Sequence, residues 1–485
     1  DNISLTSAIP TPPSPLPTAG PFTIDNTSPT AGTNFNNFTD AINWLNGATN
    51  CLATPIVFNV VAGQLFNEDP PEITASGDAV NTITFQKSGA GANPVVRRLT
   101  PGTIASTTTL GNNGDAVFVI NGGDYITFDA IDAETDPAFT AAGMIEYGYY
   151  LKKASGADAC KNVTIKNCNI TLNKAAIYSF GVYVSNNSGT ATVTVSSTGG
   201  RSENIKIFNN TITNAYGGVQ LRGYAASAPY DFYDQGNEVG ENGGNAITNF
   251  GGGASTTYGI YTIYQNNCKL NNNSISGGDG TTTTHYGIFA STSNSSNFEI
   301  NDNTISLVNN STTSQVSGIG MSVGTITTPA NIMDVSGNDI TISRPSATTG
   351  VTYFIYSTSN APNLLKVTNN IIHNSTLAGT GAVYGIYQIS TPPNYLVEGN
   401  TIHDITRTGT TSTSLFYGIS STGSSTVLNT TISGNTIHTL TGMGSTGIVG
   451  GINLLTNLTA NVFNNKIYNI TSDNASGAVN GITVG

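Results

Sequence analysis

The sequence predicts an all-β solenoid, a parallel β-helix whose coils each hold three short strands in about 33 residues. Two independent columns of residues repeat at that period. In the first column a polar residue is followed two positions later by an aliphatic residue, and from residue 168 to residue 465 it makes nine steps, a mean of 33 residues. Its polar members are Cys168, Asn210, Asn245, Asn273, Asn303, Asn338, Asn370, Asn400, Asn435 and Asn465. The second column has the consensus Tyr-Gly-Ile-Tyr, and its central residues are Gly148, Gly181, Gly218, Gly259, Gly287, Gly318, Phe354, Gly385, Gly418, Gly451 and Gly481.

A third column supplies the remaining strand of each coil. An aliphatic residue stands three positions before the polar residue of the first column, and only Asn242 interrupts it. Its members are Ile165, Ile207, Leu270, Ile300, Val335, Val367, Val397, Ile432 and Val462. Apolar residues alternate within the segments, which is the period of a strand, and Gly, Ser, Thr and Asn separate them. The absence of a helical period between strands disfavours a βαβ sheet.

The asparagines of the first column have a physical role in such a stack. At a tight turn an Asn tolerates unusual backbone angles, and its amide bonds backbone groups. At the strand spacing of about 4.8 Å, successive amides also reach each other. This column resembles the asparagine ladder of right-handed parallel β-helices, over residues 115–485 closely and over 50–115 loosely. The resemblance implies the fold and leaves the activity open.

The N-terminal segment differs from the repeats. Residues 1–35 are rich in proline and predict an extended leader or linker. Residues 36–50 predict an amphipathic helix that caps the first coil, because apolar residues recur there at helical spacing. The helix runs from Asn36 to Ala48 and holds the only tryptophan, Trp44. Residues 51–485 are assigned to the β-helix, with early strands at 55–60 and 81–85.

This arrangement, together with the Asn-Thr-Ile repeats, resembles secreted β-helix proteins of the Bacteroidota. Such proteins often carry a C-terminal sorting domain for type IX secretion, and the resemblance implies a secreted or cell-surface location. No such domain is visible in the sequence, which ends in a strand-like run from Gly481 to Val484. An uncovered last coil would expose a strand edge, so we expect further chain, a cap or a partner there.

Composition narrows the range of functions. Only 9% of residues are charged, against about 25% in a typical soluble chain. The net charge of −12 and the pI of about 4.6 disfavour nucleic acid as a partner, since that requires a basic surface. No apolar stretch approaches the ~20 residues of a membrane span.

The four cysteines lack the CxxC spacing of zinc sites. Cys160 and Cys168 either form a bridge or are buried as small apolar residues. The place of Cys168 in the Asn column favours burial.

A row of charges is expected on the outer surface. The position four residues before the Asn column is charged in six consecutive coils, at Lys206, Glu241, Lys269, Glu299, Asp334 and Lys366. The favoured interpretation is a surface ladder of opposite charges. The alternative is based on a resemblance to pectate-lyase-like enzymes, whose substrate lies on this kind of face. It implies that Glu299 and Asp334 bind Ca²⁺ and that Lys269 or Lys366 abstracts a proton from an acidic glycan.

Histidines form a second candidate site. His373, His403 and His438 each stand three residues after the Asn column, and Tyr468 follows in the next coil. Imidazoles about 4.8 Å apart could hold a soft divalent metal, whereas a stacked surface column without metal is the favoured interpretation.

The segment from Tyr224 to Asn237 is the largest departure from the period. It carries four aromatic residues, Tyr224, Tyr230, Phe232 and Tyr233. Insertions in repeat proteins often lie on the binding face, and aromatic rings stack on sugars, so these residues are candidate contacts for a glycan or a protein partner. The alternative is a loop packed on the solenoid by its own rings.

The sequence therefore predicts a non-catalytic extracellular or cell-surface protein with a structural or adhesive role, binding a glycan or another surface. One variant of this prediction is an assembly subunit that stacks end to end. The alternative is the Ca²⁺-dependent polysaccharide lyase. No other cofactor is expected.

Overall fold

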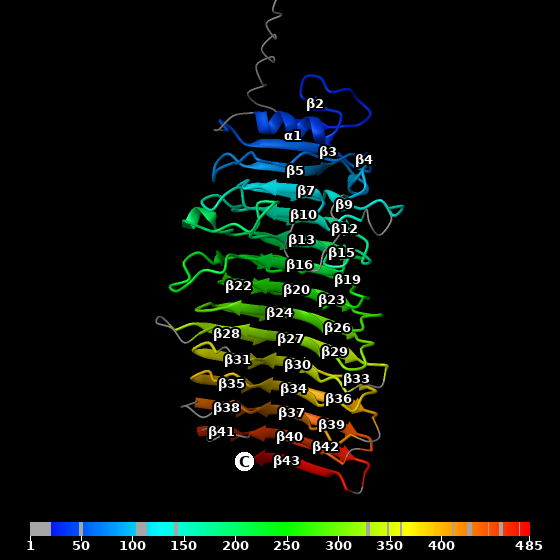
Figure 1. The fold of residues 1–485 in the computed structure, drawn as a ribbon, viewed down its shortest axis with the longest axis vertical. Helices are drawn as coiled ribbons and strands as arrows, with labels where there is room; N and C mark the ends of the chain where they lie inside the picture. Colours follow the sequence, from blue (N-terminus) through cyan, green and yellow to red (C-terminus); the bar gives the residue numbers. More distant parts are fainter. Residues whose placement is uncertain are drawn as a thin grey trace, which may run out of the picture.

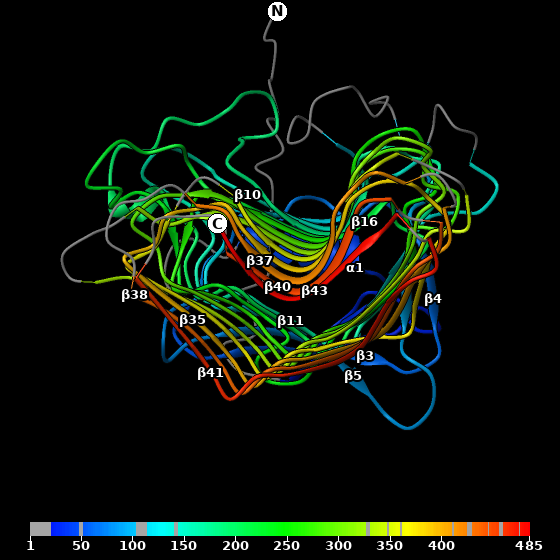
Figure 2. The same ribbon diagram turned by 90° about the horizontal axis from the view of Figure 1, so that it is seen from below.

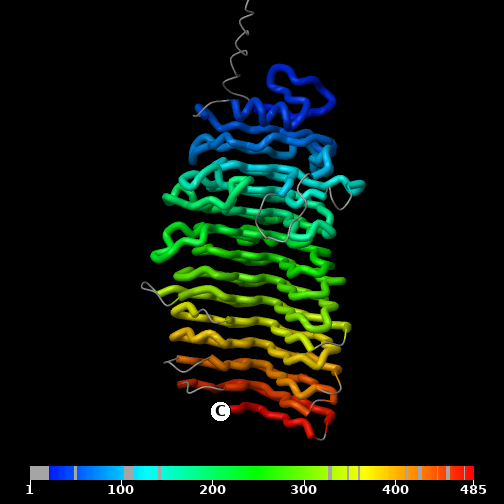
Figure 3. Tube along the Cα trace, viewed as in Figure 1, coloured from blue at the N-terminus to red at the C-terminus, as the bar shows by residue number. Residues whose placement is uncertain are grey.

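The protein is a parallel β-helix, as predicted. Its coils are stacked along one axis, and their strands form three parallel sheets that run along that axis (Figure 1). The computed structural model describes residues 21–47, 52–102, 114–139, 144–325, 330–346, 349–358, 361–409, 412–423, 429–444, 446–454, 459–474 and 476–485. The Cα trace advances regularly from coil to coil, from the N-terminal coils at the top of Figure 3 to the C-terminal coils at the bottom. Each regular coil contributes one strand to each sheet in turn. In the described part of the chain no helix is long and apolar enough to cross a membrane.

We number the three sheets in the order in which the chain passes through them in one coil. Sheet 1 lies before the Asn turn, sheet 2 follows it, and sheet 3 comes last. Sheet 1 precedes the Asn turn and consists of β2 (Asn34–Phe35), β1 (Pro21–Ile24), β3 (Ile56–Val61), β5 (Ile83–Ser88), β8 (Ile126–Asp129), β11 (Thr164–Lys166), β14 (Lys206–Phe208), β18 (Glu238–Val239), β22 (Cys268–Leu270), β25 (Phe298–Asn301), β28 (Ile332–Ser336), β31 (Leu364–Thr368), β35 (Asn394–Glu398), β38 (Asn429–Ser433) and β41 (Thr459–Phe463).

Sheet 2 follows the Asn turn and consists of β4 (Leu65–Asn67), β6 (Val95–Arg97), β9 (Asp132–Glu134), β12 (Asn169–Thr171), β15 (Thr211–Thr213), β19 (Ala246–Phe250), β23 (Ser274–Gly277), β26 (Thr304–Val308), β29 (Asp339–Ser343), β32 (Ile371–Ile372), β33 (Ser375–Leu377), β36 (Thr401–Arg407), β39 (Thr436–Gly442) and β42 (Lys466–Ser472).

Sheet 3 carries the Tyr-Gly-Ile-Tyr segments and consists of β7 (Ala116–Asn121), β10 (Tyr147–Lys152), β13 (Phe180–Val184), β16 (Gly217–Arg222), β20 (Thr257–Ile263), β24 (His285–Ser293), β27 (Val316–Val323), β30 (Thr352–Ser357), β34 (Val383–Gln388), β37 (Phe416–Ser421), β40 (Ile448–Leu454) and β43 (Ala478–Val484). A small additional pair, β17 (Asp234–Gln235) and β21 (Gln265–Asn266), lies beside the stack.

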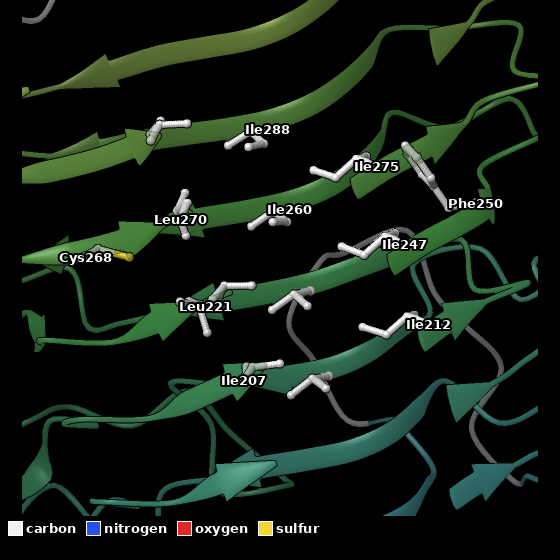
Figure 4. Packing of buried hydrophobic residues seen from close by; sticks show 14 of the residues in the cluster. Ile207, Ile212, Leu221, Ile247, Phe250, Ile260, Cys268, Leu270, Ile275 and Ile288 are labelled. Atoms are coloured by element: carbon white, nitrogen blue, oxygen red, sulfur yellow. The ribbon is translucent and has the colours of Figure 1, made fainter. Parts of the chain in front are cut away.

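The core lies inside the coil, where aliphatic residues from the three sheets meet. Ile207 and Leu270 of sheet 1, Ile212 of sheet 2 and Ile260 of sheet 3 are all at most 1% exposed, and Figure 4 shows such residues lying one above another. Cys160, Cys168 and Cys268 are buried with free thiols. The two cysteines considered for a bridge therefore pack as small apolar residues.

A helix covers the first coil, as the sequence predicts. In α1 (Phe38–Gly47) the four apolar residues of one face are buried, and the Trp44 ring lies 4.6 Å from that of Phe22, centroid to centroid. Phe22 belongs to β1, which pairs with β3. The predicted leader of residues 1–35 thus contributes two strands, β1 and β2, to sheet 1, while its run of prolines lies outside the described residues.

The asparagine column forms a continuous hydrogen-bonded ladder from Asn210 to Asn465. Each side-chain Nδ2 donates to the Oδ1 of the next coil over 2.9–3.1 Å. The left-handed backbone expected of the ladder residue belongs instead to the residue before it, as at Asn369 (φ 56°) and Gly399 (φ 68°). The ladder Asn stabilises the stack through its side chain, because its amide forms hydrogen bonds with backbone and side-chain groups of the coils on both sides.

Replacing Asn338 with alanine should destabilise the protein by about 3 kcal/mol. Its Oδ1 accepts bonds from the backbone N–H and the amide of Asn303, and its Nδ2 donates to Asn370 and to the Ile300 carbonyl. All these partners are buried, so the substitution leaves several of them unsatisfied. Urea unfolding measures the change, with Asn429→Ala, at an exposed position of sheet 1, as the control expected to cost under about 1 kcal/mol. Equal effects of the two substitutions would contradict the role assigned to the ladder.

One coil departs from the predicted alignment. In the coil of Asn245, sheet 1 pairs Val239 with Ile207 and Leu270, and Glu238 with Lys206 and Lys269. The prediction placed Asn242 and Glu241 at these two positions and was wrong there. The reason is that the segment between β18 and Asn245 is longer than in neighbouring coils and contains Gly240 and Gly243 with positive φ.

Candidate functional site

The predicted row of charges lies on the outer face of sheet 1. With Glu238 in place of Glu241, the paired positions are Lys206, Glu238, Lys269, Glu299, Asp334 and Lys366. A cavity of about 450 Å³ opens over three of these side chains, lined also by Asn267, Asn297 and Ile332 among others. The structure therefore brings together Lys269, Glu299 and Asp334.

These charges are paired with one another. Lys269 Nζ lies 2.8 Å from Glu241 Oε1 and 3.8 Å from Glu299 Oε2, and Lys366 pairs with Asp334. The hydrogen bond that the Lys269 ammonium donates to Glu241 is the main cause that raises the pKa of Lys269. A lysine acting as a general base must lose its proton near neutral pH, and this environment favours the protonated form. The geometry is that of a surface ladder of opposite charges.

The histidines stack as the sequence predicts. Ring centroids are 5.3 Å apart between His373 and His403, 5.0 Å between His403 and His438, and 4.7 Å between His438 and Tyr468, with nearly parallel planes. Ring nitrogens lie in the ring plane, so those of parallel stacked rings do not converge on one point. Two of them face carboxylates instead, His373 with Asp339 and His403 with Asp404, each at 2.7 Å. Within the described residues no group of three or more His, Cys, Asp or Glu side chains is placed to hold a metal ion.

The aromatic insertion packs partly against the solenoid. Tyr233 is 2% exposed, and its ring lies 5.3 Å from that of Tyr230 and 5.7 Å from that of Tyr264. Tyr224 and Phe232 are half-buried. Within the same segment, directly after Tyr233, Asp234 pairs with Lys153 at 3.0 Å, and both side chains are fully buried. This buried ion pair fixes the end of the insertion on the stack.

An extended aromatic surface lies on the outer face of sheet 3, at residues that the sequence analysis used only to establish the period. In Tyr258–Tyr261, the central Gly259 and Ile260 face the core, and the two tyrosines face outward. Two consecutive residues therefore face the core, which breaks the alternation of a regular strand. Glycine permits this close approach, because a Cβ at position 259 would lie 2.5 Å from the Ile275 side chain of sheet 2. Figure 2 shows sheet 3 (β10, β37, β40, β43) curving inward between loops at both its edges. The curvature brings tyrosines three residues apart into contact.

These residues form three patches of four rings each. We name them the N-terminal patch (Tyr147, Tyr150, Phe180, Tyr183), the central patch (Tyr258, Tyr261, Tyr286, Phe289) and the C-terminal patch (Tyr353, Tyr356, Tyr384, Tyr387). In the central and C-terminal patches the two rings of one strand stack at 4.3–4.4 Å between centroids. Stacking of this kind holds each ring in one orientation.

The patches differ in accessibility. All four rings of the N-terminal patch are at most 3% exposed. In the other two patches five rings are half-buried and so reach the surface: Tyr286, Phe289, Tyr353, Tyr356 and Tyr387. Burial raises the pKa of Tyr286 and of Tyr384 to about 12. Burial also raises the pKa of Tyr353 and Tyr356, so these hydroxyl groups stay protonated.

A pocket with charged walls lies at the N-terminal end of the same face. Its volume is about 470 Å³, and its lining includes Asp69, Glu72, Arg98, Tyr150 and Lys152. Arg98 pairs with Asp69 at 3.1 Å, and Lys152 pairs with Glu72. Beside the pocket, burial raises the pKa of Glu146 to about 7, although the carboxylate accepts a hydrogen bond from the backbone N–H of Asp115.

Sequence reasoning missed both parts of this face. The tyrosines could have been found from the spacing of aromatic residues at the first and fourth positions around each glycine. The pocket could not, because four of its charged residues, Asp69, Glu72, Arg98 and Asp115, lie outside the strands and share no period with the repeats, and only Lys152 lies on a repeat strand, β10.

No family model matches the chain, and no curated protein matches it. Among solved structures, a GH136 lacto-N-biosidase from Eubacterium ramulus aligns at 10% identity with a TM-score of 0.36, over 93% of this chain and 68% of that one. A DFA-IIIase from Arthrobacter chlorophenolicus A6 aligns at 11% identity and a TM-score of 0.35, over 96% and 95%. The A-module of a mannuronan C-5 epimerase from Azotobacter vinelandii aligns at 13% identity and a TM-score of 0.32, over 92% and 94%. At this level of likeness no activity or site residue of theirs transfers to this chain, and none of the comparisons supports the expected kinship with Bacteroidota proteins of type IX secretion.

Proposed function

We propose that the protein is a non-catalytic glycan-binding rod that holds an extended polysaccharide against the outer face of sheet 3. The observation that carries the proposal is the set of five accessible aromatic rings of the central and C-terminal patches. Aromatic rings supply a large apolar contact area, and sugar rings present an apolar C–H face that fits it. The rings are already fixed by stacking, so little side-chain entropy is lost on binding.

The chemistry of this face supports binding rather than cleavage. The eight strands of sheet 3 from β20 to β43 contain no Asp, Glu, Lys or Arg. Hydrolysis of a glycosidic bond ordinarily uses two carboxyl groups that flank it. The strands instead carry Ser, Thr, Asn, Gln and Tyr, whose hydroxyl and amide groups exchange hydrogen bonds with sugars.

We also place the protein outside the cell, as a secreted or cell-surface component. The low content of charged residues and the surface rich in Ser, Thr and Asn support this location. Fractionation of the source cells with an antibody to the protein tests it, and recovery only in the cytosol would refute it.

Affinity electrophoresis against soluble polysaccharides tests the binding function. The panel contains neutral glucans, mannans, xylans and galactans, and the acidic polymers alginate and polygalacturonate. At least one polysaccharide should retard the native protein, and Tyr356→Ala/Tyr387→Ala should weaken that binding at least tenfold, since a few anchoring aromatic side chains dominate such contacts. Tyr468→Ala, which removes a half-exposed ring from sheet 2, is the matched control and should bind as the native protein does.

Two results would overturn the proposal. One is the failure of every polysaccharide to retard the protein. The other is an equal loss of binding in the Tyr468→Ala control. Release of shortened chains during prolonged incubation, detected as new reducing ends or unsaturated products, would refute the non-catalytic part alone.

A further inference from the structure

We infer that the polysaccharide is linear and uncharged, and that the central and C-terminal patches are two equivalent subsites that it occupies together. The inference rests on the proposed function and specifies its ligand. It comes from two observations, the repetition of the patches along the stack and the distribution of charge on sheet 3.

The two patches have nearly the same geometry. Within a strand the ring centroids lie 4.4 Å apart in both pairs of the central patch and 4.3 Å apart in both pairs of the C-terminal patch. Between neighbouring strands, Tyr258 and Tyr286 lie 5.4 Å apart, and Tyr353 and Tyr384 lie 5.6 Å apart. Each patch exposes one such stacked pair, Tyr286 and Phe289 in the central patch and Tyr353 and Tyr356 in the C-terminal patch, so a ligand group that stacks on one pair fits the other.

The patches recur every third strand. β20 and β24 carry the central patch, β30 and β34 carry the C-terminal patch, and β27 lies between them. At the positions of the rings β27 has Ser317 and Gly320, and a Cβ on Gly320 would lie about 3 Å from the rings of Phe289 and Tyr286. Three strand spacings give a repeat of about 14 Å along the stack. A linear chain lying along the axis reaches both patches, whereas a single sugar reaches one.

The absence of charge on these strands selects the ligand class. An acidic polysaccharide would lie on strands that carry no Lys or Arg from β20 to β43, on a protein of net charge −12, and the positive charge that acts on the central patch comes from Arg222 of β16. Such strands give no compensation for removing its carboxylates from water. A neutral chain loses nothing of this kind, and its hydroxyls meet polar groups such as the Tyr387 hydroxyl, which accepts a hydrogen bond from Thr422 at 3.1 Å.

Isothermal titration with cello-, manno- and xylo-oligosaccharides of two to ten units, and with their parent polysaccharides, tests the inference. Affinity should rise at least tenfold once the chain is long enough to span about 14 Å, because the second contact is then intramolecular. Tyr286→Ala/Phe289→Ala and Tyr356→Ala/Tyr387→Ala should each remove this gain while leaving the affinity for short oligosaccharides within about twofold. Tyr286→Phe and Tyr356→Phe keep the rings and should keep the gain. Circular dichroism and the thermal midpoint establish that each variant is folded.

The outcomes separate this inference from the function on which it rests. If a polysaccharide binds but affinity does not depend on length, or if one double substitution abolishes binding of short and long chains alike, the protein binds glycans at a single site and the two-subsite inference is wrong. If polygalacturonate or alginate binds more tightly than every neutral polymer, the assignment of an uncharged ligand is wrong. Failure of all polysaccharides to bind overturns the proposed function and this inference together.

Discussion

Replacing Lys153 with methionine should lower the free energy of unfolding by about 3–5 kcal/mol. The Lys153 ammonium and the Asp234 carboxylate are both fully buried and lie 3.0 Å apart. Asp234 also accepts a hydrogen bond from the backbone N–H of Ser202 at 2.8 Å. Methionine fills most of the lysine volume but leaves the carboxylate without its counter-charge, and an uncompensated buried charge is among the most destabilising changes in a protein.

Two further variants identify the cause. Lys366→Met removes a lysine from the surface pair with Asp334, whose side chains are 32% and 21% exposed, and should cost at most about 1 kcal/mol. The double substitution Lys153→Met/Asp234→Leu removes both buried charges and should recover much of the lost stability. Urea unfolding of the four proteins at pH 7.5 measures these differences. A loss in Lys153→Met no larger than that in Lys366→Met would show that the buried pair is not needed.

The effect of Lys153→Met should also depend on pH. Burial raises the pKa of Asp234, and Lys153 opposes that shift. In the variant the carboxyl group is therefore protonated more readily in the folded than in the unfolded protein. A group with a raised folded pKa stabilises the folded state as pH falls. The stability lost through the substitution should thus shrink on acidification.

Replacing His285 with leucine should remove a loss of stability that the native protein suffers in acid. The imidazole lies in the core, edge-on to the Phe250 ring. Burial lowers its pKa from 6.5 to about 3, although the Val308 backbone acts in the opposite direction. Between these values the unfolded chain takes up a proton that the folded protein excludes. Stability therefore falls as pH falls, by up to about 1.4 kcal/mol per pH unit, or roughly 3 kcal/mol at pH 4.

The measurement is the urea unfolding midpoint of both proteins at several pH values from 8 to 4. At pH 8 the imidazole is neutral in both states, so the difference between the proteins there reports packing alone. An aliphatic residue suits the site, because the next coil has Val316 at the equivalent position and the coil two further on has Val383, while Thr257 and Thr352 hold it in the other two coils. Glu146, whose pKa is raised to about 7, changes stability in the opposite sense but is present in both proteins and cancels. A constant difference from pH 8 to pH 4 would contradict the assignment.

The fold was predictable because neighbouring coils repeat each other. A strand of this solenoid pairs with the equivalent strand one period away, so the pattern that reveals a strand also reveals its partner. The Asn-x-Ile and Tyr-Gly-Ile-Tyr columns therefore determined the period and the three sheets, and the apolar spacing from Phe38 to Leu45 determined the cap helix. The same regularity located the charged row on sheet 1 and the histidine stack on sheet 2.

The candidate site was predictable only in part. The structure has Glu238 in the charged row where the sequence analysis expected Glu241. The difference arises from the length of a single turn, which cannot be deduced from the average period. The pairing of Lys153 with Asp234 joins residues 81 positions apart through an insertion that has no counterpart in other coils. The pocket beside Arg98 likewise draws on irregular segments. Contacts of this kind depend on the path of the chain between repeats rather than on the repeat.

The repeats were enough to predict the coil, its period and the residues that share a face. The folded chain was needed to reveal that the two tyrosines of a Tyr-Gly-Ile-Tyr segment point the same way. A flat strand would turn residues at positions one and four to opposite faces. Here Gly259 and its equivalents approach the isoleucines of sheet 2, sheet 3 bends inward, and both tyrosines reach the outside. That bend converts a periodic column into the stacked aromatic patches on which the proposed function rests.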